Sequence, residues 1–369
     1  MALTTFVAGQ VLTAAQLNDS YAAVDWNENV IINGAMQVAQ RGTSTASITA
    51  SGYYTADRFR LGLASLGTWT ESVETDAPTG SGFRKSLKML CTTASASPAS
   101  GGQLRVQQSF EGQNVQQFAK GTASAKQFSL SFWVKSNVTG TFICTLLDND
   151  NTRAVSASYT ISASATWEKK TITFPADTTG AFDNDNASSL QANWWLGAGT
   201  DFTSGTLATT WESTSNPNLA VGQTNVASAT NNYWQITGVQ LQPERASQFL
   251  FQDYGTVLAQ CQRYYWAISG VNKNVANAFY FGATAVRGVL NNPVPMRTGP
   301  TLTASSGTNY FDFQTGSGDD LFNTINAIYN ANEYNVYLGV TSGVSGTSGV
   351  AGAILTNDAS AKIELNAEL

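Results

Sequence analysis

Histidine is absent from this sequence of 369 residues, and that absence excludes several kinds of chemistry. Histidine is the commonest general base and metal ligand near neutral pH, so the usual catalytic triads and most catalytic zinc sites cannot be built. No P-loop, G-x-S-x-G or dinucleotide-binding motif takes its place. Cysteine is scarce too, and its wide spacing fits neither a disulfide framework nor a zinc site, so we expect buried, reduced thiols at Cys91, Cys144 and Cys261.

Charged side chains are also rare, at 12% of the sequence, about half the usual share of a soluble domain. Serine, threonine, asparagine, glutamine and glycine must therefore cover most of the surface. Such a surface suits a chain that is partly buried in an assembly, or one that binds neutral polar ligands. The net charge of −6 argues against nucleic acid as a partner, because phosphate binding requires a basic face.

Long apolar runs are missing, and no stretch approaches the ~20 residues that a membrane-spanning helix needs. The first ten residues, MALTTFVAGQ, lack the charged start and the apolar centre of a signal peptide. We therefore expect a protein that folds in a cytosol and has no membrane partner.

What the sequence does contain is a long series of short β-strand patterns. Phe128, Leu130, Phe132 and Val134 alternate with mostly polar residues, which predicts a half-buried antiparallel strand. Many short strands with polar turns are typical of a jelly roll or β-sandwich, which we assign to residues 31–252. Similar strands, separated by clusters of turn residues, are predicted over 141–148, 155–162, 167–175 and 233–241.

A helical pattern interrupts the strands at 253–266. Beyond it strands return, punctuated by prolines that cannot lie in central strands. The sequence therefore predicts an all-β fold, with an antiparallel jelly-roll or β-sandwich domain followed by a second β-sandwich domain over 253–369. The junction helix that opens this second domain has one apolar stripe: Val257, Leu258, Cys261, Tyr264 and Tyr265.

The first 30 residues form a separate segment with a short helix of its own. The motif TAAQ at 13–16 matches a capping box, and Leu17, Tyr21 and Val24 follow it on one helical stripe. A helix of about a dozen residues is too short to stand alone in water, so this stripe needs a surface. Two interpretations stay open: the helix packs on its own domain, or it docks on a partner or on further copies of the chain.

Two DNDN turns supply four candidate metal ligands, Asp148, Asp150, Asp183 and Asp185. Their carboxylate oxygens are of the kind that calcium prefers, although the pattern is not that of an EF-hand. Asx-rich turns are also the ordinary way to connect strands, so the alternative is that these residues only shape turns. Apart from this calcium hypothesis, we expect no cofactor.

Trp194, Trp195 and Trp211 lie in a region that is predicted to be rich in loops, over 186–219. Flat aromatic faces flanked by asparagine and glutamine are typical of surfaces on which sugar rings stack. A large sandwich also buries tryptophans, so the alternative is that all three belong to the core. We retain them as candidate glycan-binding residues.

Several segments, taken in their order along the chain, resemble tail-fibre and receptor-binding proteins of tailed bacteriophages. The segment TTFVAGQVLTAAQLNDSYAAV looks like the virion-attachment end of such an appendage. The sustained heptads of a coiled-coil shaft, which fibres usually carry, are not found in this sequence. From about residue 30 to 369 the resemblance rests on VIINGAMQVAQRGTS, YYTADRFRL, LSFWVKSNVTGTF with DNDNTR and YTISASATWEKKTITFPADTTG after it, WQITGVQLQPERASQFLFQDYGTVLAQCQRYYW, NPVPMRTGPTLT and IELNAEL.

The resemblance implies a jelly roll like that of carbohydrate-binding modules, a homotrimeric virion appendage, and recognition of a host surface polysaccharide. It brings no catalytic residues, and we expect no enzyme activity. We expect a virion protein, assembled in the host cytoplasm, that contacts other virion proteins of the tail or head through residues 1–30.

Two alternatives stay open. One is a purely structural virion part, such as a tail adaptor, capsid fibre or decoration protein. The other is a glycan depolymerase, which can work with carboxylates alone if two of them face a cleft roughly 5–10 Å apart.

Overall fold

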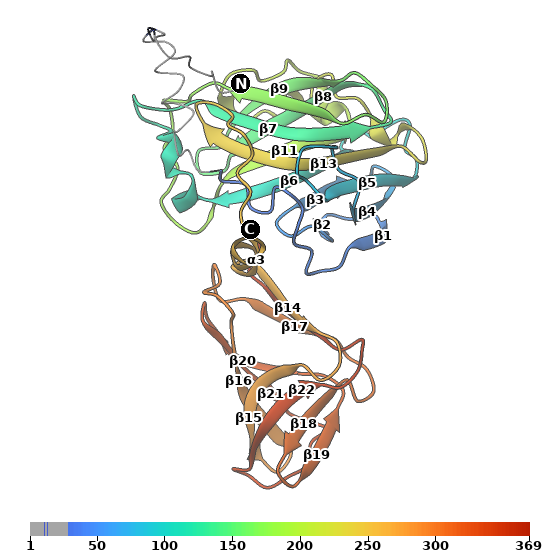
Figure 1. The fold of residues 1–369 in the computed structure, drawn as a ribbon, viewed down its shortest axis with the longest axis vertical. Helices are drawn as coiled ribbons and strands as arrows, with labels where there is room; N and C mark the ends of the chain where they lie inside the picture. Colours follow the sequence, from blue (N-terminus) through green and yellow to red (C-terminus); the bar gives the residue numbers. More distant parts are fainter. Residues whose placement is uncertain (1–10, 12, 14–28) are drawn as a thin grey trace.

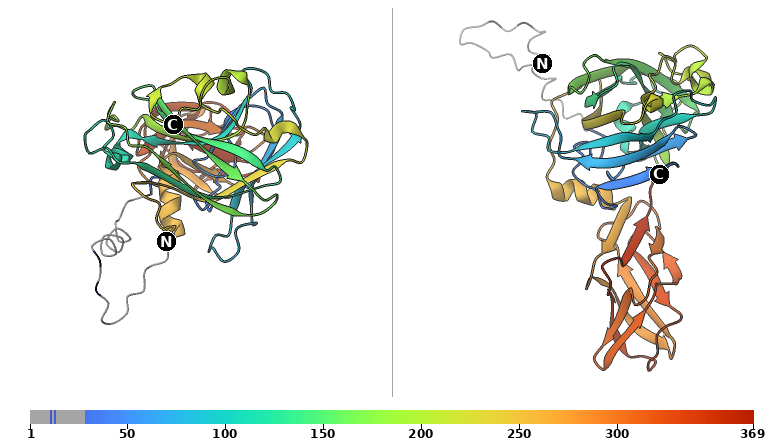
Figure 2. Two further views of the ribbon diagram at one scale, coloured as in Figure 1. Left: turned by 90° about the horizontal axis from the view of Figure 1, so that it is seen from above. Right: turned by 90° about the vertical axis from the view of Figure 1, so that its right-hand side faces the viewer.

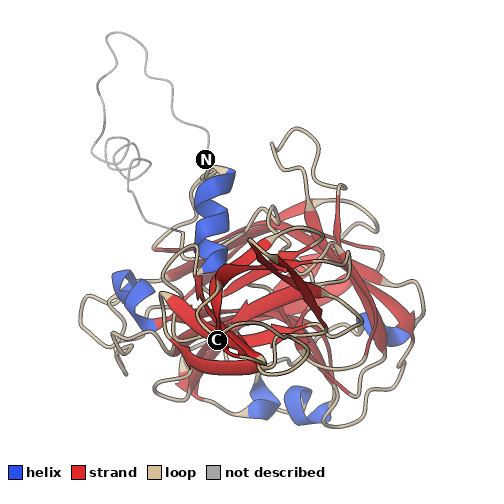
Figure 3. Ribbon diagram, turned by 90° about the horizontal axis from the view of Figure 1, so that it is seen from below, coloured by secondary structure: helices blue, strands red, loops and turns tan. Residues whose placement is uncertain are grey.

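The computed structural model in Figure 1 describes residues 29–369, together with Val11 and Thr13. Two bodies follow one another along the long axis, β1 to β13 in the upper body and β14 to β23 in the lower one. The strand pairings of the described residues are antiparallel, and helices are few and short (Figure 3). The predicted all-β fold with two sandwich domains is confirmed.

The first domain packs a six-stranded sheet against a seven-stranded one. Sheet A has the order β1 (Ser44–Ile48), β4 (Thr68–Glu74), β5 (Ser86–Thr93), β13 (Tyr233–Pro243), β7 (Phe128–Ser136) and β10 (Glu168–Phe174). Sheet B has the order β12 (Glu212–Ser213), β9 (Arg153–Ile161), β8 (Gly140–Asp148), β11 (Ser188–Ala198), β6 (Gln103–Glu111), β3 (Arg60–Ala64) and β2 (Gly52–Tyr53).

The inner faces of sheets A and B enclose one large apolar core. In β7, Phe128, Leu130, Phe132 and Val134 all point into this core, as their alternation in the sequence predicts. Trp194 of β11 lies among them, with its ring centroid 6.1 Å from that of Phe132. Removal of this much apolar surface from water is the main force that holds the two sheets together.

The outer face of sheet A is covered over part of β7 and β13, although the alternation in β7 predicts a half-buried strand. Residues 244–252 leave the end of β13 and run back along this face, where the Leu250 amide donates to the Gln240 side chain at 3.1 Å. Ser129 and Ser131, which share the face with Gln240, are therefore buried. The period of a strand identifies its two faces, but a later segment of the chain decides whether the second face meets water.

The second domain is a smaller sandwich with a core of its own. Val286 and Ile363, from its two sheets, meet in this core, which is separate from that of the first domain. Sheet C has the order β14 (Tyr265–Ser269), β23 (Lys362–Asn366) and β17 (Thr301–Ala304). Sheet D has the order β19 (Gly318–Phe322), β18 (Phe311–Thr315), β22 (Ala351–Thr356), β15 (Asn274–Gly282), β16 (Ala285–Asn291), β21 (Asn335–Val340) and β20 (Ala327–Ala331).

Helix α3 (Tyr254–Gln262) lies between the two bodies (Figures 1 and 2). It begins at Asp253, whose carboxylate accepts a hydrogen bond from the Thr256 amide at 3.0 Å. Val257 and Cys261 of the predicted stripe pack on Val38 of the first domain. The junction helix therefore belongs, by its packing, to the first domain.

The other described helical segments are single turns: η1 (Gly112–Asn114), η2 (Gln116–Phe118), α2 (Thr200–Thr203), η3 (Asn216–Asn218) and η4 (Val226–Ser228). In the part of the chain that the structure describes, no helix has the length and apolar character to span a bilayer. The three cysteines are free and buried, as expected.

The last residues of the chain return to the first domain and close the junction. The Glu368 carboxylate forms an ion pair with the guanidinium of Arg58 and another, at 3.2 Å, with that of Arg41. Arg58 is 1% exposed, and its guanidinium carbon lies 3.4 Å from the ring centroid of Tyr264. Tyr264 was predicted to lie on the helix, but it follows the end of the helix and fills the space between the domains.

Glu111 of β6 holds the other side of this junction. Its carboxylate accepts hydrogen bonds from Arg263, at 2.8 and 2.6 Å, and from the Tyr264 hydroxyl. Burial works to raise the pKa of Glu111, but the hydrogen bonds from Arg263 and Tyr264 hold that pKa below its ordinary value. We call this set of residues the junction seam: Arg41, Arg58, Glu111, Arg263, Tyr264 and Glu368.

Substitution of Glu368 by glutamine is expected to lower the free energy of unfolding by about 3 kcal/mol. The amide keeps the shape of the carboxylate but leaves the buried Arg58 cation without its counter-charge. Denaturant unfolding of the full chain measures this loss, and small-angle scattering measures whether the two bodies stay docked. Glu333→Gln, at an exposed position, is the matched control. Equal stability of the two variants would contradict the role given to Glu368.

Candidate functional site

The structure corrects the prediction that three tryptophans form a glycan platform. Trp194 and Trp195 are fully buried, and Trp211 is 9% exposed. Trp194 faces the core between the sheets, whereas Trp195 faces outward and is covered by Phe202, 5.3 Å away between ring centroids. The indole of Trp211 donates to the Pro175 carbonyl at 2.8 Å. A sugar ring needs an open aromatic face, and none of the three offers one.

The metal hypothesis is also corrected, first at Asp148. This carboxylate is buried and lies 2.5 Å from the Lys120 ammonium. The same ammonium lies 3.1 Å from Asp177, which pairs in turn with Arg153 at 2.8 Å. The negative charge of Asp148 is thus neutralised by a lysine of the protein itself.

The carboxylates of Asp150 and Asp185 organise backbone. The Asp183 amide donates to the Asp150 carboxylate at 2.9 Å, so the two DNDN turns lie side by side. The Asp185 carboxylate accepts from the Ala187 amide at 2.9 Å. Among the described residues, no group of three or more acidic or cysteine side chains is placed to hold a metal ion. The turn interpretation accounts for the carboxylates of Asp148, Asp150 and Asp185, which accept hydrogen bonds from backbone amides of these turns.

The third predicted site, Leu17, Tyr21 and Val24, lies outside the described residues. Its assignment to attachment or oligomerisation therefore stays a prediction.

Aromatic side chains do gather on an exposed surface, but they lie in the second domain. On the outer face of sheet D, Phe279 and Phe281 of β15 are 39% and 51% exposed, and Tyr329 of β20 is 41% exposed. Tyr337 of β21 lies 5.2 Å from Tyr329 between ring centroids. These four rings and Arg287 of β16 form what we call the aromatic platform.

Arg287 is the centre of the aromatic platform. Its guanidinium carbon lies 3.5 Å from the ring centroid of Phe281 and 4.1 Å from that of Tyr329. Cation–π contact on both sides fixes the rings in place while their other faces stay open. Gly339 supports this arrangement, because a Cβ there would come within 2.8 Å of the Tyr329 ring.

Carboxamide side chains border the platform. The register pairs Asn277 with Val289, and Val289 with Tyr337, so these three residues share the outer face of sheet D. Asn277 and Asn291 are exposed on the same face. Rings that stack, beside amides that donate and accept hydrogen bonds, are the groups that bind the apolar faces and the hydroxyls of a sugar.

The sequence carries a signal for the platform that tryptophan content obscures. In NVANAFYFG, period-2 alternation puts Phe279 and Phe281 on the face opposite to Tyr280. Aromatic residues on both faces of one strand mean that one set cannot lie in the core of a two-layer sandwich. A search for aromatics on the polar face of a strand would have found the platform.

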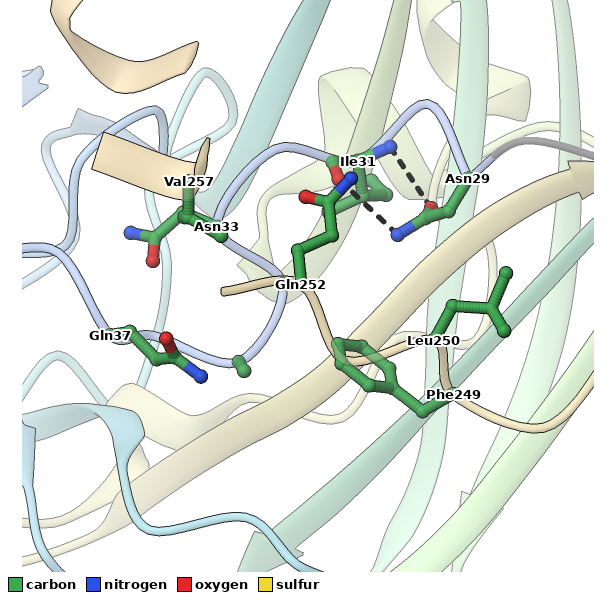
Figure 4. A pocket seen from close by; sticks show the side chains of 10 residues that line it. Asn29, Ile31, Asn33, Gln37, Phe249, Leu250, Gln252 and Val257 are labelled. Atoms are coloured by element: carbon green, nitrogen blue, oxygen red, sulfur yellow. Dashed lines mark hydrogen bonds between the residues drawn. The ribbon is translucent and has the colours of Figure 1, made fainter. Parts of the chain in front are cut away.

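A polar groove of about 720 Å³ lies at the junction, between η1, η2 and α3. Next to it is a pocket of about 20 Å³, room for about one water molecule, whose lining includes Asn29, Phe249 and Gln252 (Figure 4). The groove offers hydrogen bonds but no open aromatic face, since its Tyr264 is 1% exposed. Carboxamides dominate its lining: Asn29, Gln113, Asn114, Gln116, Gln117 and Gln260.

Known proteins resemble the chain only distantly. No family model and no curated protein matches it. An enzymatically active domain of tailspike protein 4 from bacteriophage CBA120 is similar over 58% of this chain and 21% of its own length, with 16% identity and a TM-score of 0.30. The chain thus spans about a fifth of that protein.

Carbohydrate-binding modules are among the similar solved structures. A family 11 module of the Clostridium thermocellum cellulase Lic26A-Cel5E matches 58% of this chain and 95% of its own length, with 10% identity and a TM-score of 0.28. The CBM22-1 xylan-binding domain of Paenibacillus barcinonensis Xyn10C matches 60% of this chain and 97% of its own length, with 9% identity and a TM-score of 0.28. Likeness this distant does not bear on function, so the fold rests on the strand order itself.

Calcium is expected to have no effect on the melting midpoint, because Lys120 already neutralises Asp148. A chelator should leave the midpoint unchanged. Asp148→Asn should lower the free energy of unfolding by about 3 kcal/mol, since it leaves an excess buried cation. Asp150→Asn, which keeps an acceptor for the Asp183 amide, is the matched control and should change stability by less than about 0.5 kcal/mol. A melting midpoint that falls when chelator is added and recovers when calcium is added would contradict this expectation and support a calcium site.

Proposed function

We propose that this protein is a bacteriophage virion appendage that binds a host surface glycan through the aromatic platform of its second domain. The observation that carries the proposal is the set of open rings around Arg287, bordered by carboxamides. The sequence resemblance to tail-fibre and receptor-binding proteins supplies the virion context. Binding takes place without cleavage of the glycan.

The chemistry of the platform suits a weak, repeated interaction. Each stacked ring contributes modestly, and a flat surface buries little of a sugar. A homotrimer would link three platforms, and linked sites raise overall avidity by about 10²–10⁴-fold. We therefore propose a trimer, whose mass in solution can be measured directly.

Attachment to the particle is assigned to the opposite part of the chain. Asn29, the first residue of the continuous described chain, belongs to the first domain, while the platform lies on the body that extends away from it (Figure 2). We propose that residues 1–30 contact virion proteins of the tail or head.

Phe281→Ala and Tyr329→Ala are each expected to reduce binding of the oligomer to host cells by about tenfold or more, because each removes a stacking face. Fluorescence-detected binding to host cells measures the loss. Tyr334→Ala is the matched control, since Tyr334 is 66% exposed at the turn between β20 and β21, outside the platform.

Three results would refute parts of this proposal. A folded oligomer that ignores host cells would favour a purely structural virion part. Binding that survives both ring substitutions would keep the receptor role and refute the platform. Release of reducing sugar from host polysaccharide would identify a depolymerase.

Deletion of residues 1–28 is expected to leave both β domains folded, because their strands begin at Ser44. The truncated chain should keep the unfolding midpoint of the full chain and fail to enter phage particles. Normal incorporation would mean that the attachment point lies elsewhere on the chain.

A further inference from the structure

A second polar surface lies on the outer face of sheet B. The register pairs Arg60 of β3 with Gln107 of β6, and Gln107 with Asn193 of β11, so the three lie in one row across three strands. Strands are about 4.8 Å apart, so the row spans about 10 Å between the outer backbones. Gln103 and Arg105 share this face of β6. We call these five residues the arginine strip.

The two arginines of the strip have no counter-charge. Within the described chain, no carboxylate lies within 4.0 Å of Arg60 or Arg105, whereas Arg58, Arg153 and Arg263 each pair with one. Burial, and to a smaller degree the repulsion from Arg60, lowers the pKa of Arg105 to about 10. Two like charges held together at a partly buried site favour an anionic ligand.

The arrangement of Arg105 leaves donors free. Its Nε donates to the Gln107 side chain at 3.3 Å, and its guanidinium carbon lies 5.1 Å from the Trp195 ring centroid. Gly62 beside it has no side chain to fill the space, and a Cβ there would meet Arg105 at 3.0 Å. The terminal nitrogens of Arg105 are thus available to a carboxylate, which they fit as a planar fork.

Two buried oxygen acceptors of the strip have no donor. The Asn193 amide nitrogen donates to the carbonyls of Thr145 and Gln191, at 3.4 and 3.5 Å, which leaves its oxygen without a partner. Asn193 is 1% exposed, and the Gln103 side-chain oxygen is likewise buried and unpartnered. An unpaired buried acceptor costs free energy, and both oxygens lie beneath the surface of the strip, out of reach of a ligand.

We propose that the arginine strip binds an acidic saccharide, whose carboxylate is held by the partly exposed Arg60 and Arg105. The proposal rests on the proposed function and adds a second site with a charged ligand class. The arginines themselves select only the carboxylate, and the saccharide that carries it follows from the proposed function. Nucleic acid needs a broader basic face than two arginines on a chain of net charge −6.

The test is a glycan array that carries oligosaccharides of uronic and sialic acids together with their carboxyl-reduced counterparts. The full chain should bind acidic members more strongly than the reduced ones. Arg60→Gln/Arg105→Gln should lower binding to the acidic members by about tenfold or more and leave binding to the reduced ones unchanged. Arg84→Gln/Arg245→Gln removes the same charge from two exposed positions and is the matched control.

The double variant should fold, because the substitutions remove repulsion between two cations, and denaturant unfolding verifies this. Equal binding of acidic and reduced glycans by the full chain would overturn the strip while leaving glycan recognition intact. The proposed strip would also be overturned if the folded double variant still bound acidic glycans as strongly as the full chain, or if the control variant lost as much of this binding as the double variant. Failure to bind any glycan would reject the strip and the proposed function together.

Discussion

The buried charge of Arg58 is the constraint on which the arrangement of the two domains depends. Its guanidinium is 1% exposed, so it requires a counter-charge inside the protein, and Glu368 supplies one from 310 residues away. The Tyr264 ring beneath it belongs to the short connection between α3 and β14. One cation thereby joins the first domain, the junction and the last residues, and it directs the second domain with its aromatic platform away from the first.

The same principle explains how a chain with few charges arranges its surface. Lys120, whose side chain is fully buried, forms ion pairs with Asp148 and Asp177, and Arg263 forms one with Glu111. Because many of the scarce charges are paired inside, hydroxyl and amide groups cover much of the exterior. Two parts of the molecule differ from this polar exterior. One is the aromatic platform, with its exposed rings around Arg287, and the other is the arginine strip on sheet B, with its two unpaired arginines.

Much of the fold follows from the sequence, because alternation along a strand reflects the geometry of the strand itself. Phe128 and Phe132 face the core as predicted, and the junction helix lies where the strand pattern breaks. The tryptophans show the limit of such reasoning: alternation places Trp194 and Trp195 on opposite faces, but a later loop carrying Phe202 covers the outward one. The contact of Arg58 with Glu368 joins residues 310 positions apart, which is too distant for any local pattern to predict.

Hydroxyl-radical footprinting of the oligomer with and without host polysaccharide tests glycan recognition by the platform most directly. It reports the exposure of each ring in the unmodified protein, so the result does not depend on whether a variant folds. The account predicts that oxidation of Phe281 and Tyr329 falls when the polysaccharide binds, while oxidation of Tyr334, at its exposed turn, stays constant. A complex that forms while Phe281 and Tyr329 stay as reactive as in the free protein would contradict it.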